Sequence, residues 1–388
     1  MTACMVGWSH SRFGKLDDKD LESLVVGVAA EAMQDAGIGP EDVDEIFLGT
    51  FNGGMDPQDF AASLVLQADE RLRFTPATRV ENACATGSAA IYEGLNAIAA
   101  GRARFVLVVG VEKMTALSSA EVGDILIKCS YVREDRVPGM SFPGLFGRIT
   151  ELYYQRYGDQ SDALARIAAK NHRNGSVNPF AHMQKDLGYE FCRQESEKNP
   201  FVAGPLKRTD CSMISDGAAA CVLADVGTAL AMPKAVAFRG MSHVNDILSM
   251  SKRDIVAFEG PERAWKRALA EARLDLLDLD LVETHDCFTS AELIEYEAMG
   301  LTGKGQGARA ILEGWTEKDG KLPVNPSGGL KAKGHPIGAT GVSMHVMTAM
   351  QLTGEAGRMQ VPGAKVAGVF NMGGAAVANY VSILERLR

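Results

Sequence analysis

An internal repeat is the feature of this sequence that most restricts its possible folds. When the segments starting at residues 36 and 272 are aligned, apolar and acidic positions agree in order: Ile38 with Leu274, Asp42 with Asp278, Val43 with Leu279, and Ile46 with Val282. In each copy, apolar residues at helical spacing precede a short apolar stretch, which predicts a helix followed by a strand. A repeated αβ unit predicts two similar α/β halves, each with a mixed sheet covered by helices.

A second pair of segments supports the same division. Residues 83–110 and 334–370 each contain a glycine-containing turn, a helix of small residues and an apolar strand, in that order. In the first copy of the αβ unit, apolar residues from Leu21 to Ala36 recur at helical spacing, and Gly37 suits the position after a helix C-terminus. We therefore predict an α/β fold.

The segment from residue 112 to 205 has no partner in the repeat. It is rich in glycine, proline, methionine and aromatic residues, and only Ser161 to Asn171 shows clear helical spacing. We predict an inserted loop domain that contributes ligand contacts, as loops on a rigid scaffold commonly do. The predicted division is an N-terminal half of residues 1–111 and 206–230, the loop domain of residues 112–205, and a C-terminal half of residues 231–388.

Composition excludes several classes of function. The formal charge of −9 leaves no basic field for nucleic acid or for an anionic membrane surface. No stretch comes near the roughly 18 uninterrupted apolar residues of a membrane span, and the N-terminus lacks a secretory signal pattern. The seven cysteines are never spaced as CxxC, which argues against a disulfide framework or a zinc ribbon. We expect a soluble cytoplasmic protein in a reducing compartment that binds neither nucleic acid nor membrane.

Cys84 is the first candidate for chemistry. It lies in VENACATGSAAIYEGLNAIAAG, where apolar residues from Ile91 onward mark a helical face and small residues precede them. The cysteine thus falls at a strand-to-helix turn, where free backbone N–H groups and the helix dipole lower the pKa of a thiol. A small buried cysteine without chemistry is the alternative interpretation.

His335 is the second candidate. The segment NPSGGLKAKGHPIGATG places it in a glycine-dense turn, with Pro336 at the predicted first position of a helix. We expect this loop to be too backbone-exposed for ordinary core, so that its histidine can face a ligand. In the repeat, residues 84–87 (CATG) lie over residues 335–338 (HPIG). A cysteine and a histidine are then predicted to meet at two helix starts, the arrangement of nucleophile and base that thiol catalysis needs.

A third segment, THDCFTSAE, follows the predicted strand at residues 281–284. His285 and Cys287 stand at the end of this strand. Thr289 with Glu292 forms a capping-box signature for the next helix. Histidine, aspartate and cysteine this close together also suit a metal, but no second cluster completes a tetrahedral ligand set, so we predict no metal site.

These three segments resemble those of the thiolase superfamily. The resemblance covers nearly the whole chain, because further segments share it: AAKNHRNGSVNPFAHMQ at 168–184, DCSMISDGAAACVLAD at 210–225 and FNMGGAAVANY at 370–380. The HDCF form is similar to the sterol-carrier-protein-x type of thiolase. The resemblance implies the five-layer αβαβα thiolase fold, with two repeated α/β halves and an inserted loop domain. It also implies coenzyme A and acyl-CoA as substrates, no further cofactor, and a homodimer or homotetramer.

The resemblance also implies roles for individual residues. Cys84 would take an acyl group from a 3-oxoacyl thioester, and His335 would activate its thiol. His335 and His285 would form the first oxyanion hole, although most thiolases have an asparagine at the position of His285. The backbone N–H groups of Cys84 and Gly373 would form the second oxyanion hole. A tight turn entering a strand at residues 375–377 is the alternative role of this glycine.

The C-terminal motif departs from the family pattern. Many thiolases carry a second catalytic cysteine in CxGGG, whereas this sequence has NMGG with Asn371, and an asparagine cannot exchange the required proton. In the HDCF subgroup the cysteine of that motif takes over the acid/base duty. The resemblance therefore makes Cys287 the group that protonates or deprotonates the α-carbon of acetyl-CoA.

The implied reaction is reversible Claisen chemistry, in which coenzyme A cleaves a 3-oxoacyl-CoA or condensation forms it. A thiolase-like lyase, or an acyltransferase with a non-CoA acceptor, is one alternative, but the retained Cys84 and His335 argue against the lyase. A non-catalytic scaffold for a small acyl-CoA-binding partner protein is another, motivated by the missing C-terminal cysteine. The intact HDCF and GHP segments favour an enzyme.

The remaining histidines and most of the remaining cysteines receive no role from their spacing. We interpret five histidines as surface or satisfied buried residues: His10, His172, His182, His243 and His345. We interpret four cysteines as structural thiols: Cys129, which lies in the inserted loop domain, Cys192, Cys211 and Cys221. Lysine and arginine residues of the loop domain are expected to meet the phosphates of coenzyme A, but the sequence does not choose among them.

Overall fold

The computed structural model describes residues 3–137 and 139–388. A nine-stranded mixed sheet runs through it in the order β3-β2-β4-β7-β1-β8-β11-β10-β9. Its strands are β1 (Ala3–His10), β2 (Glu45–Gly49), β3 (Ala77–Val80), β4 (Phe105–Glu112), β7 (Gly217–Asp225), β8 (Val236–Asn245), β9 (Leu281–Glu283), β10 (Val366–Gly373) and β11 (Ala378–Arg386). β1 and β8 pair only at Cys4 with Ala237 and Met5 with Val236. The sheet therefore consists of two smaller sheets that meet at a short seam.

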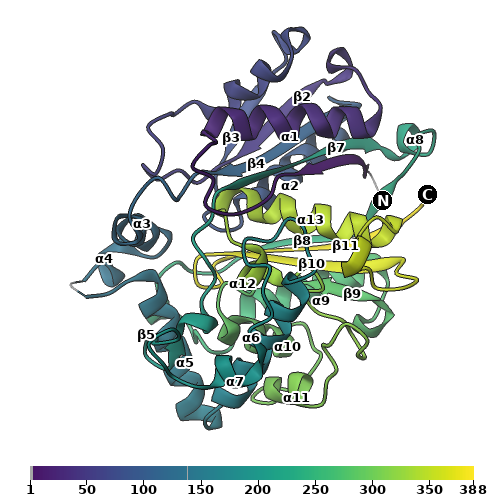
Figure 1. Ribbon diagram of the computed structural model, residues 1–388. Coiled ribbons are helices and arrows are strands. Elements are labelled where there is room, and N and C mark those ends of the chain that lie inside the picture. The colour runs from purple at the N-terminus through teal and green to yellow at the C-terminus, as the bar shows by residue number, and fades with distance from the viewer. Residues whose placement is uncertain (1–2, 138) are drawn as a thin grey trace.

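Helices separate and cover the two smaller sheets. α2 (Thr86–Ala99) and α13 (Ile337–Thr353) lie between them (Figure 1). α1 (Leu21–Ala36) covers the outer face of one sheet, and α9 (Glu259–Ala272) covers the outer face of the other. The resulting order of helix, sheet, helix, sheet and helix confirms the predicted five-layer αβαβα fold.

The two inner helices approach each other closely because their N-terminal turns contain glycine. A Cβ atom on Gly87 would lie 2.7 Å from the backbone nitrogen of Val342. A Cβ atom on Gly341 would collide with the backbone nitrogen of Ser88. Only residues without side chains allow this approach. The CATG and HPIG segments therefore meet, as the repeat predicted.

The first αβ unit matches its sequence pattern closely. Asp20 caps α1 by accepting a hydrogen bond from the backbone nitrogen of Ser23, and Gly37 ends the helix with a φ of +70°. The following strand, β2, starts at Glu45, after Pro40–Asp42 forms a 3₁₀ turn that ends at Val43.

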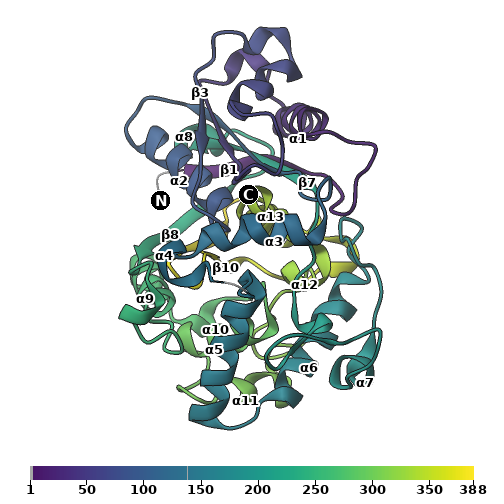
Figure 2. The same cartoon turned by 90° about the vertical axis from the view of Figure 1, so that its left-hand side faces the viewer.

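The inserted segment is more helical than predicted. It contains α3 (Ser119–Leu126), α4 (Val132–Asp135), α5 (Phe142–Tyr157), α6 (Ser161–Gly175) and α7 (Gly188–Arg193), followed by the hairpin of β5 (Phe201–Ala203) and β6 (Leu206–Lys207). Figure 2 shows α3, α4 and α5 on the near side of the molecule. Spacing missed α5 because it contains Pro143 and two glycines. Proline is, however, tolerated in the first turn of a helix, where Pro143 lies. Gly147 permits a close contact, because a Cβ atom on this residue would lie 2.9 Å from the carbonyl oxygen of Ala203.

The loop that carries His335 is buried, so the prediction of an exposed loop is wrong. All residues from 322 to 349 are buried. α6 packs directly on this loop, where a Cβ atom on Gly328 would lie 2.5 Å from the Cα atom of Gly175. The side chain of Asn178 also donates a hydrogen bond to the carbonyl of Ser327 (2.8 Å). Glycines in this loop therefore permit close packing rather than exposure.

Two other local predictions are wrong. α10 (Thr289–Ala298) has no capping box, because the Thr289 hydroxyl donates to Asp210 (2.8 Å) and Glu292 pairs with buried Lys170 (2.5 Å). No strand forms at residues 375–377, which belong to the tight turn between β10 and β11. Gly374 and Ala376 both have positive φ angles in this turn.

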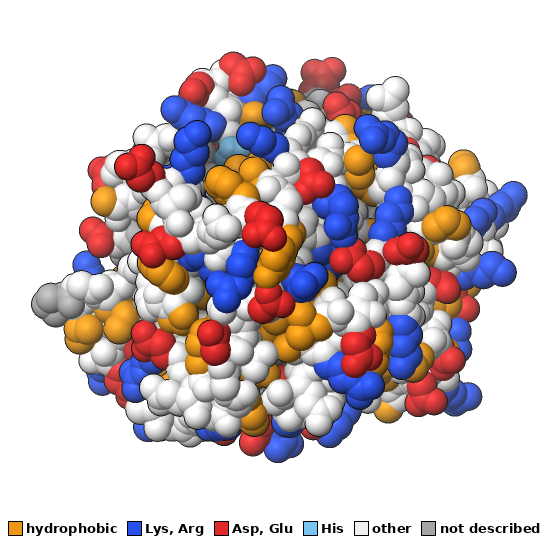
Figure 3. All heavy atoms as spheres, turned by 60° about the horizontal axis from the view of Figure 1, so that its bottom comes forward, with side chains coloured by type: hydrophobic (Ala, Val, Ile, Leu, Met, Phe, Trp, Pro, Cys, Tyr) orange, Lys and Arg blue, Asp and Glu red, His pale blue; other side chains and the backbone are white. Residues whose placement is uncertain are grey.

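The outer surface carries charges of both signs. Figure 3 shows lysine and arginine side chains interspersed with aspartate and glutamate side chains over the lower face of the molecule. Among residues 3–137 and 139–388, no helix is long and apolar enough to cross a membrane.

Candidate active site

Cys84, His285 and His335 come together although they are far apart in the sequence. The Sγ atom of Cys84 and a ring nitrogen of each histidine all lie within 4.8 Å of one another. Cys84 precedes α2, His285 follows β9, and His335 precedes α13. Cys84 and His335 also line a cavity of about 590 Å³, together with Cys287. The structure therefore brings four of the predicted site residues to one place.

A strained turn presents Cys84 to this cavity. Ala83 has a φ of +49°, a left-handed conformation that few residues other than glycine adopt. The Thr86 hydroxyl stabilises the turn by accepting from the backbone nitrogen of Asn82 (2.8 Å) and donating to the carbonyl of Ala83 (2.6 Å). Strain of this kind is characteristic of functional sites.

The hydrogen bonds of His335 decide which of its ring nitrogens carries the proton. The hydroxyl of Thr340 has one proton, which it donates to the carbonyl of Pro336 (2.9 Å). The same oxygen must therefore accept from Nδ1 of His335 (2.7 Å). Neutral His335 then has a free lone pair on Nε2, which has no hydrogen-bond partner among the described residues. This nitrogen can accept a proton from Cys84.

The hydrogen bonds of His285 place its proton on the opposite nitrogen. The side-chain nitrogen of Asn371 donates to the carbonyl of Cys84 (3.1 Å), and its oxygen accepts from the hydroxyl of Ser88 (2.8 Å), which determines the orientation of the amide. The second N–H group of the amide points at Nδ1 of His285 (2.9 Å), which must accept. Neutral His285 therefore carries its proton on Nε2. Burial lowers the pKa of His285 to about 4, so this neutral donor persists at pH 7.

The surroundings of Cys84 favour its thiolate. The pKa of Cys84 lies well below the usual value, chiefly because the thiol of Cys129 hydrogen-bonds to it. His285 and His335 lower the pKa of Cys84 further, and together these contacts outweigh the opposing effect of burial. Cys129, which we interpreted as a structural thiol, therefore lies at the site and lines the same cavity as Cys84. Its position in an irregular insertion gave no periodic signal that would join it to the site.

Cys287 differs from Cys84 in its protonation. Burial, and then the nearby charge of Cys84, raise the pKa of Cys287 well above its usual value. Cys287 therefore remains a neutral thiol at pH 7 and can donate a proton into the cavity.

Gly373, the fifth predicted site residue, lies at the end of β10 against the turn of Cys84. A Cβ atom on Gly373 would lie 2.6 Å from the carbonyl oxygen of Asn82 and 3.3 Å from Cβ of Ala85. A side chain at this position would push the two segments apart. Only glycine keeps its backbone next to the nucleophile.

A buried carboxylate ties the HDCF segment to the loop that leads to His335. Asp286 accepts hydrogen bonds from the backbone nitrogens of Leu330 (2.6 Å) and Lys331 (3.2 Å), which lie in α12 (Gly329–Lys333). It also accepts from the side chain of Asn171 in α6 (2.7 Å). Asp286 stands between two predicted site residues, His285 and Cys287, but its sequence position alone gave it no catalytic role.

His182, which we interpreted as a surface or satisfied buried histidine, also lies at this cavity. It lines the same cavity as Cys84. Its Nδ1 atom is 2.8 Å from the hydroxyl of Ser215. Cys211, which we predicted to be a structural thiol, lines this cavity as well.

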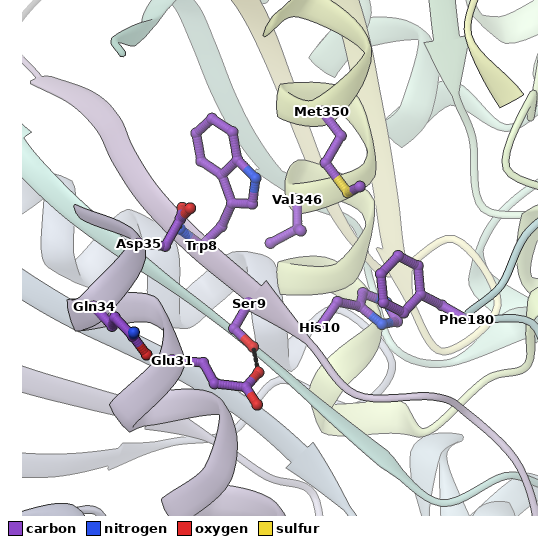
Figure 4. Close-up of a pocket in the computed structure, with 9 residues that line it drawn as sticks. All are labelled: Trp8, Ser9, His10, Glu31, Gln34, Asp35, Phe180, Val346 and Met350. Atoms are coloured by element: carbon purple, nitrogen blue, oxygen red, sulfur yellow. Dashed lines mark hydrogen bonds between the residues drawn. The ribbon is translucent and has the colours of Figure 1, made fainter. Parts of the chain in front are cut away.

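A second cavity, of about 510 Å³, lies between β1, α1 and α13 (Figure 4). The hydroxyl of Ser9 donates to Glu31 there (2.6 Å), and Nε2 of His10 lies 2.7 Å from the hydroxyl of Ser343. Both ring nitrogens of His10 are occupied, because Nδ1 donates to the carbonyl of Ser11 (2.5 Å). No predicted site residue is among the residues that line this cavity.

A cysteine and two histidines at this spacing also raise the question of a metal ion. A zinc ligand must offer a lone pair, and neutral histidine has only one. His285 uses its lone pair on Nδ1 to accept from Asn371. The cluster therefore offers two ready ligands, Cys84 and His335, which is fewer than zinc sites use.

Sequence comparisons match the chain along most of its length. Family models described as thiolase, N-terminal domain, and as thiolase C-terminal domain-like match residues 3–226 and 242–386. An acetyl-CoA acetyltransferase of Methanothermobacter thermautotrophicus is 34% identical over 384 residues, which cover 98% of this chain and 99% of that protein. Sterol carrier protein 2 of Bos taurus is 33% identical over 385 residues, which cover 95% of this chain and 69% of that protein.

Solved structures share the fold. A structure described as Ltp2-ChsH2(DUF35) aldolase superimposes with a TM-score of 0.84 at 20% identity, covering 100% of this chain and 98% of that one. Human mitochondrial 3-ketoacyl-CoA thiolase in complex with CoA superimposes with a TM-score of 0.75 at 18% identity, with the same coverage of both chains.

Proposed function

Since this chain belongs to the thiolase family and is an acyltransferase, we propose that it cleaves 3-oxoacyl-CoA reversibly through an acyl-enzyme on Cys84. One observation carries the proposal: the two histidines beside the thiol have opposite tautomers. His335 offers a lone pair and His285 offers a proton to the same place. A base and an oxyanion donor are the two groups that acyl transfer to a thiol requires.

In the first step, Nε2 of His335 takes the thiol proton and the thiolate of Cys84 attacks the 3-oxo carbon. The backbone N–H groups of Cys84 and Gly373 would stabilise the resulting oxyanion. Collapse breaks the bond between the α-carbon and the 3-oxo carbon, leaving an acyl group on Cys84 and the enolate of acetyl-CoA. The N–H of His285, and that of His335 once it is protonated, would hold the enolate oxygen.

Cys287 would complete the proton transfers. Its neutral thiol gives a proton to the α-carbon of the enolate, which releases acetyl-CoA and leaves a thiolate on Cys287. That thiolate takes the proton of the incoming coenzyme A thiol, and the coenzyme A sulfur attacks the acyl group. Cys84 is released as a thiolate, so the protons balance over the cycle. The raised pKa of Cys287 supports this order of events, because the resting thiol is protonated.

The cavity supports an acyl-CoA substrate. Apolar side chains line much of it, including Leu126, Phe142 and Phe288, which suits an acyl chain. Arg208 also lines the cavity and is exposed to solvent. We propose that Arg208 meets a phosphate of coenzyme A, since arginine binds phosphate oxygens in a bidentate manner.

Assembly and compartment are part of the proposal. In the part of the chain that the structure describes, β3 is an edge strand that pairs with β2 alone, so its other edge can pair with a strand of a second copy, in keeping with a homodimer or homotetramer. One structural neighbour is described as Ltp2-ChsH2(DUF35) aldolase, a name that joins two components. We therefore still expect that a small partner protein can bind this chain. All seven cysteines are free, which suits the reducing cytoplasm.

Acyl labelling tests the proposal. After brief exposure to acetyl-CoA, mass spectrometry should find the acetyl group on the peptide that contains Cys84. Cys84→Ala should carry no label, whereas Cys221→Ala, which alters a thiol in β7, should be labelled like the original protein. Loss of 3-oxoacyl-CoA absorbance with free coenzyme A should follow the same pattern. Labelling elsewhere with Cys84 bare, or no turnover of any 3-oxoacyl-CoA, would favour the lyase, the acyltransferase with another acceptor, or the scaffold.

A further inference from the structure

The cavity between β1, α1 and α13 takes no part in the proposed reaction (Figure 4). Its volume of about 510 Å³ lies within the range of small-molecule sites. β1 and α1 belong to the N-terminal half of the chain, α13 belongs to the C-terminal half, and Phe180 comes from the inserted segment. The cavity therefore lies where three parts of the fold meet, and none of its lining residues lines the cavity of Cys84.

One wall of this cavity is apolar. Trp8 and Val346 are buried, with exposed fractions of 6% and 0%. Phe180 and Met350, which are partly buried, extend this wall. Figure 4 shows these side chains across the cavity from the polar side chains of α1. A wall of this kind stabilises the hydrocarbon part of a ligand by removing it from water.

The opposite wall presents hydrogen-bond acceptors. The carboxylate of Glu31 accepts one hydrogen bond, from the hydroxyl of Ser9 (2.6 Å), and its other oxygen has no donor among the described residues. The oxygen of Ser9 keeps its lone pairs, because its only proton is donated to Glu31. Gln34, which lies about one turn further along α1, adds an amide oxygen. The wall therefore suits a ligand that carries several donors.

Glu31 also gives the cavity a negative charge that no neighbouring side chain neutralises. Asp35 pairs with Lys234 (2.8 Å), but no lysine or arginine in the part of the chain that the structure describes pairs with Glu31. His10 adds no positive charge, because burial lowers its pKa to about 3 and the ring is neutral at pH 7. An anionic ligand such as an acyl-CoA would therefore be repelled.

The protein itself shows how an ammonium group binds beside this cavity. The Nζ atom of Lys234 lies 3.8 Å from the centroid of the Trp8 ring and pairs with Asp35. An ammonium between an aromatic ring and a carboxylate gains both cation–π and ionic attraction. Glu31 stands about one turn before Asp35 on α1 and lines the same cavity as Trp8, but it has no lysine of its own.

We propose that this cavity binds a small organic cation, a primary ammonium group carried on an apolar chain or ring. A primary ammonium has three N–H donors, which match the acceptors of Glu31, Ser9 and Gln34. Its apolar part would lie against Trp8 and the rest of the apolar wall. A metal ion suits the cavity less, because Ca²⁺ takes about six to eight oxygen ligands, more than these three side chains supply.

Titration calorimetry with 2-phenylethylammonium chloride tests the proposal, and the neutral alcohol 2-phenylethanol is the matched probe. The ammonium should bind saturably, and the alcohol should bind about tenfold more weakly, because a hydrogen bond to a charged group contributes more than one between neutral groups. Glu31→Gln, which keeps the shape of the side chain, should weaken binding of the ammonium by about the same factor. Glu22→Gln, the same change at an exposed position of α1 outside the cavity, should bind like the original protein.

The methyl resonance of Met350 reports where the ion binds, because this side chain lines the cavity. In protein that is isotope-labelled at the methionine methyl groups, the resonance should shift when the ammonium is added, and Met350→Leu identifies it in the spectrum. Four results would overturn the proposal: no saturable binding, equal binding of the alcohol, equal binding to a folded Glu31→Gln, or binding without a shift of this resonance. Because the readout is binding, it is independent of whether the proposed thiolase reaction occurs.

Discussion

Replacing Thr340 by valine tests the role of His335 without touching either the base or the nucleophile. The hydroxyl of Thr340 is the only partner of Nδ1 of His335 among the described residues, and valine has the same shape without that oxygen. The carbonyl of Pro336 loses one donor but keeps hydrogen bonds from the backbone nitrogens of Ala339 (3.0 Å) and Thr340 (2.9 Å). The substitution therefore removes one interaction of the histidine and leaves the start of α13 satisfied.

The expected magnitude comes from the charge that His335 acquires. A hydrogen bond between neutral groups contributes about 0.5–1.5 kcal/mol net, and one to a charged group about 1.5–3 kcal/mol. Loss of the Thr340 hydroxyl therefore disfavours the imidazolium relative to the neutral ring by about 1.4 kcal/mol. This difference corresponds to about a tenfold change in an equilibrium constant. Since the imidazolium stabilises the thiolate of Cys84, the thiol should titrate about one unit higher in the variant.

Alkylation by iodoacetamide as a function of pH measures this shift. A free cysteine titrates near about 8.5, and the thiolate of Cys84 should already form well below that pH because its pKa is lowered. The rate should therefore be constant at neutral and alkaline pH, and should fall as the pH drops through the lowered pKa. Thr340→Val should move this midpoint upward by about one unit, whereas Thr340→Ser, which keeps the acceptor, should leave it in place. An unchanged midpoint in a folded Thr340→Val would refute the assignment of the His335 tautomer.

Three further substitutions separate the proposed steps. Cys287→Ala should still be acetylated on Cys84 but should fail to exchange the α-protons of acetyl-CoA for deuterium. Exchange at the original rate would exclude Cys287 as the group that protonates the α-carbon. Asn371→Asp should turn His285 to its other tautomer, because a carboxylate accepts a hydrogen bond from Nδ1. The variant should then lower kcat by about 10²- to 10³-fold, which is the effect of losing one oxyanion donor. Nitrogen NMR of the imidazole ring would report the tautomer directly. Arg208→Ala should raise the KM for coenzyme A, most clearly at low salt where phosphate contacts are strongest. Arg193→Ala, a control in the inserted loop domain, should leave that KM unchanged.

The site residues that the sequence predicted and those that it missed depend on different structural information. The repeat placed Cys84 and His335 at equivalent helix starts, and equivalent positions in two packed halves lie near each other whatever the details of the side chains. Thr340 and Asn371 act through single hydrogen bonds to the histidines, and these depend on how closely α13 and β10 approach the nucleophile turn. Such distances are not encoded in the spacing of residue types.

The loop domain was the least predictable part of the fold. α5 contains a proline and glycines that resemble those of a loop, and its glycine is required by contact with the distant hairpin of β5 and β6. Cys129 lies in a three-residue turn between short helices, where no periodic pattern exists to mark it. Local signals fail at both places because tertiary contact determines the local conformation.

The groups that make Cys84 reactive all lie later in the chain than the cysteine itself. Cys129, His285 and His335 each contact its thiol, and Asn371, which determines the tautomer of His285, lies in β10 close to the C-terminus. A ribosome that has synthesised the first half of the protein has made Cys84 and Cys129 but neither of the two histidines, so the general base and the oxyanion donor are still missing. Only the later part of the chain supplies both groups. The growing polypeptide is thus spared from premature acylation, and the reactivity of this one thiol reports whether synthesis and folding are complete.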